Sequence, residues 1–158
     1  MSEHSPPTPT PTGTPLWFLG LLALAALYVW WSSTPLPLVV ATHFGAGGQA
    51  NGYMTHTTYV RFMLGFVVFL PWLVNFVMAR VLASQRATTV EFLLRHMRYF
   101  GLMLVAFVCS MHALVVKANA ASPPTLDSTR FSVALGAYML VVVLWILALR
   151  RRFRRPAD

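Results

Sequence analysis

Four apolar runs, separated by polar segments, dominate the chain. They cover residues 16–31, 59–79, 99–116 and 131–149. At 1.5 Å per residue, each is about long enough to cross a hydrocarbon core of roughly 30 Å, although the first needs its flanking residues. No ten-residue alternating strands of a barrel are present, and backbone amides in lipid must be bonded internally. The pattern therefore predicts an all-α membrane protein with four transmembrane helices in an antiparallel bundle.

The runs define one domain between two tails. Residues 16–150 form the predicted four-helix domain, and residues 1–15 are a Pro/Thr-rich tail too polar to bury a core, so we expect disorder there. Residues 151–158 form a basic cytoplasmic tail. The first run is predicted to be retained, because no lysine or arginine precedes it and it ends in aromatic residues.

The segment at residues 33–57 is neither a helix nor a tail. Pro35 and Pro37 favour an extended backbone, β-branched residues follow, and four glycines supply turn conformations. A small extended or hairpin-like loop between the first two helices is predicted. Its candidate ligand-binding or structural residues are His43, Phe44, Gly48, Asn51, Gly52 and Tyr53.

Two polar residues in the apolar runs stand out. Asn75 lies inside the second run, where an unbonded amide is costly, so we expect it to point into the bundle and bond to another helix. A structural clasp is favoured over a transport path. His112 comes one turn before the end of the third run, which Lys117 marks, so it is expected near the loop.

The basic residues that give the chain its net charge of +8 are concentrated in two segments. Nine of the twelve basic residues lie between the second and third runs or after the fourth: Arg80, Arg86, Arg95, Arg98, Arg150, Arg151, Arg152, Arg154 and Arg155. The positive-inside rule then places both termini in the cytoplasm and the 33–57 loop outside. These arginines are expected to contact anionic membrane lipid, and no nucleic-acid partner is predicted.

Catalytic chemistry has little support. The chain is 57% hydrophobic and has only four acidic residues, none inside a run, so we assign no catalytic residue and no cofactor. His43, His56 and His112 could meet at the outer face, and three imidazoles with an open position would suit zinc. No histidine pair has helical ligand spacing and no carboxylate supports them, so hydrogen bonds between the loop and the bundle are favoured over a metal.

The THF..GG...GY segment, which begins at Thr42, is similar to the bacterial domain-of-unknown-function 1648 family. His112, Asn119 and the arginine-rich end resemble its short members. That family is an integral membrane domain also found in Sdp-type immunity proteins, which protect a cell from a secreted peptide toxin. The resemblance implies a multi-pass protein of the bacterial cytoplasmic membrane and adds Asn119 to the candidate site.

These features favour a non-enzymatic binding protein whose outward loop recognises a peptide, a lipid or a membrane protein. The family resemblance implies immunity-like protection as one such role. A small membrane transporter subunit or a metal-binding membrane enzyme is the alternative.

Overall fold

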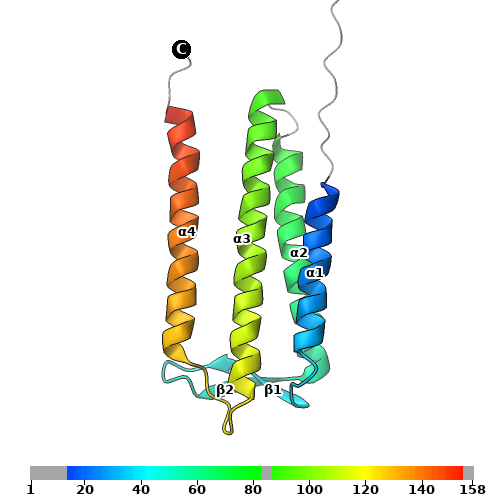
Figure 1. The fold of residues 1–158 in the computed structure, drawn as a ribbon, viewed down its shortest axis with the longest axis vertical. Coiled ribbons are helices and arrows are strands. Elements are labelled where there is room, and N and C mark those ends of the chain that lie inside the picture. The colour runs from blue at the N-terminus through cyan, green and yellow to red at the C-terminus, as the bar shows by residue number, and fades with distance from the viewer. Residues whose placement is uncertain (1–13, 83–86, 155–158) are drawn as a thin grey trace, which may run out of the picture.

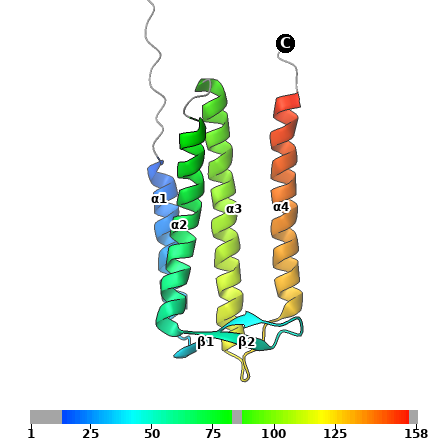
Figure 2. The same ribbon diagram turned by 180° about the vertical axis from the view of Figure 1, so that it is seen from behind.

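The computed structural model describes residues 14–82 and 87–154. Within these residues, four helices and one hairpin follow one another (Figures 1 and 2). The elements are α1 (Leu16–Ser32), β1 (Val39–Phe44), β2 (Ala50–Thr55), α2 (His56–Leu82), α3 (Ala87–Asn119) and α4 (Ser128–Arg154). The four helices run side by side, and the hairpin crosses one end of them (Figure 1). We call that end the cap end.

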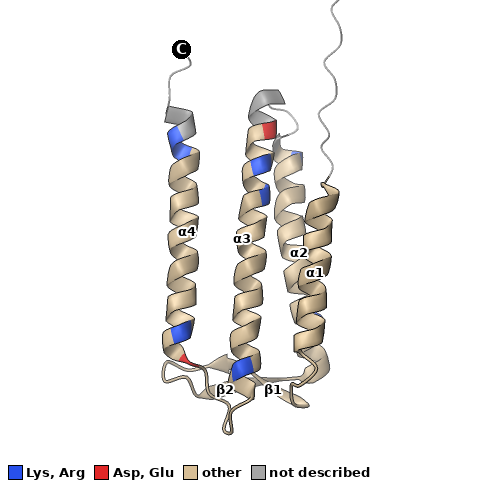
Figure 3. Ribbon diagram, viewed as in Figure 1, with Lys and Arg blue, Asp and Glu red and all other residues tan. Residues whose placement is uncertain are grey.

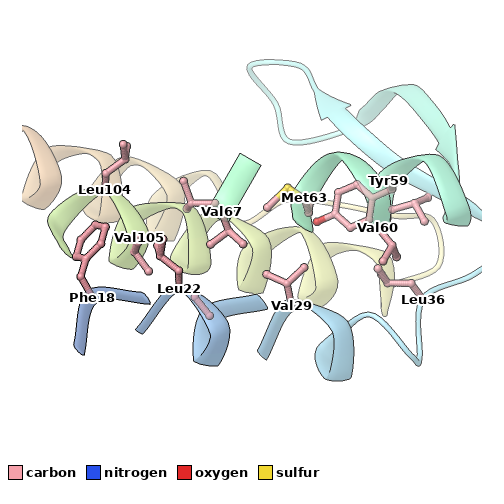
Figure 4. Close-up of a cluster of buried hydrophobic side chains, with 13 residues drawn as sticks. Phe18, Leu22, Val29, Leu36, Tyr59, Val60, Met63, Val67, Leu104 and Val105 are labelled. Atoms are coloured by element: carbon pink, nitrogen blue, oxygen red, sulfur yellow. The ribbon is translucent and has the colours of Figure 1, made fainter. Parts of the chain in front are cut away.

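Helices α1, α2 and α3 pack on one another and contain the main hydrophobic core. Figure 4 shows the apolar side chains that these helices direct toward one another. Each helix contributes residues at helical spacing, such as Phe18, Leu22 and Val29 from α1. This spacing places the side chains on one face, which is buried against the neighbouring helices.

Gly101 of α3 lies where all three of these helices meet. A Cβ atom built there would stand 2.9 Å from both Phe18 Cζ of α1 and Asn75 Nδ2 of α2. Asn75 is buried, as expected, but its amide donates to the carbonyl of Pro71, 2.8 Å away in its own helix. The predicted bond to another helix was therefore wrong. The interhelical contact of Asn75 is its close approach to Gly101.

Helix α4 lies apart from this three-helix core (Figures 1 and 2). Among the helices and strands of the described residues it packs on α3 alone, and none of its described side chains is buried. Phe107 stacks on Tyr138 with ring centroids 4.2 Å apart, and Phe100 meets Trp145 at 5.2 Å. Within the described residues, α4 thus joins the three-helix core through α3.

In the part of the chain that the structure describes, three helices are long and apolar enough to cross a membrane: His56–Val81, Glu91–Asn119 and Ser128–Arg151. Helix α1 is apolar but has only 17 residues. Charged residues of the described chain gather toward the two ends, and a wide middle zone carries none (Figure 3).

Several predicted boundaries shift in the structure. Helix α2 begins at His56 and α3 at Ala87, so both extend beyond the apolar runs. Residues 151–154 of the predicted basic tail belong to α4. Residues 1–13 of the predicted N-terminal tail and 155–158 of the basic tail lie outside the described residues.

Candidate functional site at the hairpin cap

The predicted hairpin is present. Strands β1 and β2 are antiparallel, with Val39 opposite Thr55 and Phe44 opposite Ala50, and the register shifts near His43. Together with the turn that joins them, these strands form what we call the cap, residues 39–55. Val40 and Ala41 are fully buried against the helix ends, whereas most of β2 is exposed.

Asn119, at the end of α3, attaches the cap to the helices. Its Oδ1 accepts from the Ala41 amide at 2.8 Å, and its Nδ2 donates to the Ala41 carbonyl at 2.9 Å. One side chain thus bonds both backbone polar groups of a buried strand residue, as a neighbouring strand would. Nδ2 also lies 2.9 Å from the carbonyl of Val115, which fixes the amide on its own helix.

The turn of the cap binds the α3–α4 connection. Gly48 has φ +80°, a conformation that side-chain-bearing residues rarely adopt, and its carbonyl accepts from the Leu126 amide at 2.8 Å. A Cβ atom at Gly48 would stand only 2.3 Å from the Leu126 carbonyl oxygen. Gln49 also forms a bridge with Thr125. The glycine is therefore required by both conformation and space.

His43 and Asn51 form a hydrogen bond across the hairpin, between Nδ1 and Oδ1. Since an amide oxygen only accepts, Nδ1 carries the proton and Nε2 is left as an acceptor. No hydrogen bond among the described residues uses Nε2. Gly52 permits this packing, because a Cβ there would lie 2.8 Å from His43 Cβ. The Tyr53 side chain is exposed, with its hydroxyl 3.5 Å from the Ala50 carbonyl.

His112 is buried beneath the cap end and joins three helices. Its Nε2 lies 2.9 Å from Ser32 Oγ of α1, and its Nδ1 lies 2.8 Å from the Tyr59 hydroxyl of α2. Ser32 donates its only proton to the Tyr28 carbonyl at 2.6 Å, so it accepts from His112 Nε2. Tyr59 therefore donates to Nδ1. The result is a directed chain from Tyr59 through His112 and Ser32 to Tyr28, which satisfies both nitrogens of a neutral imidazole.

The three histidines considered for zinc have separate partners. His43 bonds to Asn51, His56 Nε2 lies 3.1 Å from the Ser33 carbonyl, and His112 holds the chain just described. Within residues 14–82 and 87–154, no three His, Cys, Asp or Glu side chains gather as a metal site would require. The expected hydrogen bonds of His43 and His112 between the loop and the bundle were wrong, because His43 bonds within the hairpin and His112 bonds to side chains of α1 and α2.

A cavity of about 570 Å³ lies below the cap, between the cap ends of α3 and α4. Its walls come from the β1 end and turn, from α3, and from the start of α4. The lining residues are Thr42, His43, Phe44, Gly45, Ala46, Met111, Leu114, Val115, Leu126, Ser128, Phe131 and Ser132. The volume and the mainly apolar lining with a few polar groups are typical of small-molecule sites.

Most of the predicted site residues fall into two groups, and Tyr53 and Asn75 belong to neither. His43 and Phe44 line the cavity, and Asn51 positions His43. Gly48, Gly52, His112 and Asn119 instead hold the cap and the helices in place. Asn75 lies far along α2, against Gly101, and takes no part in the cavity.

Sequence reasoning missed the α3 and α4 walls of the cavity, including Met111, Phe131 and Ser132. These residues sit in uniformly apolar runs, where no local pattern separates a cavity wall from a lipid-facing surface.

Comparison with protein-family models, curated proteins and solved structures finds no match to this chain.

Proposed function

We propose that the chain is a four-span membrane protein of the bacterial cytoplasmic membrane and acts as a non-enzymatic binding protein. Both termini face the cytoplasm, and the cap faces outward. The orientation is supported by the charges: Arg80, Arg95, Arg98, Arg150 and Arg151 lie toward the end opposite the cap, where the positive-inside rule expects them. Helix α1 crosses with the help of its flanking residues.

The cavity under the cap carries the binding proposal. It is the place where the loop singled out by sequence meets two helices, and it is lined by His43 and Phe44. The hydrogen bonds of Asn119 and Gly48 hold its roof against α3 and the α3–α4 connection. A roof built in this way forms a preorganised pocket, which lowers the ordering cost of binding. A peptide, a lipid or a membrane protein is the class of ligand proposed.

The proposal includes immunity-like protection from a peptide toxin. This part is supported by the resemblance of the cap motif alone. A secreted peptide would approach from outside, where the cap is placed.

Crosslinking in intact cells tests the proposal. A photo-crosslinking amino acid at Ala46, which lines the cavity, should form an adduct with a peptide, a protein or a lipid. Ser132→Trp fills the cavity and should abolish that adduct. Ala137→Trp is the matched control, because Ala137 lines a separate hollow of about 290 Å³ between α3 and α4. No adduct at Ala46, or an adduct indifferent to Ser132→Trp, contradicts the proposed function.

A further inference from the structure

Among the described residues, those that line the cavity under the cap include no Lys, Arg, Asp or Glu. The acid and base next to the lining residues Leu126, Ser128 and Phe131 in the sequence are paired with each other: Arg130 Nε lies 3.1 Å from Asp127 Oδ2. An anionic ligand would therefore meet no free opposite charge on the walls. Burying a charge without a partner is costly, so the lining favours an uncharged group.

Much of the apolar lining lies in helices long enough to span a membrane. Met111, Leu114 and Val115 belong to the Glu91–Asn119 span, and Phe131 belongs to the Ser128–Arg151 span. Because α4 packs only on α3, the described chain places no third helix over the seam between them. If α3 and α4 cross a bilayer, its hydrocarbon is the apolar material that can reach this seam.

The polar part of the lining lies in the cap and in the first turns of α4. His43 supplies Nε2 as an acceptor, because Nδ1 already donates to Asn51. The hydroxyl of Ser132 has no hydrogen-bond partner among the described residues, whereas Thr42 already bonds to the Gly52 carbonyl at 3.5 Å. The ligand that uses His43 Nε2 must carry a hydrogen-bond donor.

We propose that the cavity binds a membrane lipid, with an acyl chain against α3 and α4 and an uncharged, hydroxyl-bearing head at His43 Nε2. This inference rests on the proposed function and names the ligand class of the same site. A lipid is favoured over a peptide because the apolar walls lie within the spans, where a bilayer lipid enters laterally and a peptide from outside must first insert.

The test uses the full chain in nanodiscs with two lipids that carry the same photoreactive acyl chain. One is a diacylglycerol, whose head has a hydroxyl donor, and the other is a phosphatidylcholine, whose head has none. Diacylglycerol should label Met111, Leu114 or Phe131 more strongly than lipid-facing Leu140 of α4, which is 59% exposed. The preference over phosphatidylcholine should be about fivefold, the effect of roughly one hydrogen bond.

Variants then distinguish recognition of the lipid head from binding of its acyl chain. Ser132→Trp should remove labelling of the cavity by both lipids, and Ala137→Trp should not. His43→Leu should erase the preference for diacylglycerol, and His43→Gln, which keeps an acceptor, should retain part of it. Leu114→Phe serves as a second cavity-filling variant if Ser132→Trp does not fold.

Two results overturn the lipid proposal: cavity labelling no stronger than that of Leu140, or equal labelling by the two lipids. If a peptide or protein adduct at Ala46 persists in cells and is still blocked by Ser132→Trp, the proposed function survives with another ligand. If that adduct is also absent, both proposals fail.

Discussion

Asn119 bonds to both backbone polar groups of Ala41, although 78 residues separate them in the chain. This pair attaches an otherwise unflanked edge of β1 to the end of α3. A two-stranded hairpin is at best marginally stable alone, so its packing on the helices and this pair of bonds maintain it.

Removing the Asn119 amide tests this attachment. Asn119→Ala leaves the buried amide and carbonyl of Ala41 without partners, which costs about 1–3 kcal/mol in the free energy of unfolding. Amide hydrogen exchange across the cap should accelerate in detergent-solubilised protein. Ser110→Ala is the matched control, since the exposed Ser110 hydroxyl bonds only to Ala106 of its own helix. Equal exchange in the two variants would contradict the role of Asn119.

The turn gives a second prediction. Gly48→Ala forces a Cβ onto a residue with positive φ and toward the Leu126 carbonyl, so it should destabilise the protein by about 2 kcal/mol or more. Thermal unfolding in detergent measures this loss. Gly20→Ala in α1 is the control, because a Cβ there meets nothing within 4 Å and alanine favours a helix. A neutral Gly48→Ala would show that the turn is not held as described.

The local features of the cap could be predicted from the sequence. Pro35, Pro37 and the glycines indicate a hairpin before α2, and Thr55 and Asp127 supply N-cap hydrogen bonds to the amides of Thr58 and Arg130. Each of these signals acts within a few residues. The hairpin and the helix starts therefore follow from short-range chemistry.

The long-range features could not be predicted. Nothing near Asn119 in the sequence indicates Ala41 as its partner, and nothing near Gly48 indicates the approach of Leu126. The position of α4 was missed for another reason: its run is apolar on every face, so periodicity cannot separate a face in lipid from a face against protein. Asn75 was expected to bond across helices, but the carbonyl of Pro71 is within reach in its own helix.

The buried hydrogen-bond chain at His112 gives a third prediction. Tyr59→Phe removes the donor to Nδ1 and leaves a buried acceptor unpaired, which should lower the free energy of unfolding by about 1–3 kcal/mol. Tyr53→Phe is the control, because the Tyr53 side chain is exposed. Both variants are compared by thermal unfolding in the same detergent. Equal stability of the two variants would show that the hydrogen-bond chain at His112 contributes nothing to the free energy of unfolding.

The place where α1, α2 and α3 meet, at Gly101, gives a fourth prediction. Gly101→Ala places a Cβ at 2.9 Å from Phe18 and Asn75 and should cost about 1–3 kcal/mol, whereas Gly65→Ala, which meets nothing within 4 Å, should cost little. Adding Phe18→Leu relieves one of the two contacts. The double variant should lose less than the sum of the single variants, and strict additivity would argue against the contact.

The orientation of the cap is the claim on which the binding site depends, and cysteine labelling tests it directly. In a Cys109→Ala background, which removes the only native thiol, Ala46→Cys reports the cap and Val81→Cys reports the opposite end of α2. A membrane-impermeant maleimide should label residue 46 in intact cells and residue 81 only after the membrane is permeabilised. Labelling of residue 81 in intact cells, with residue 46 protected until permeabilisation, would contradict the account.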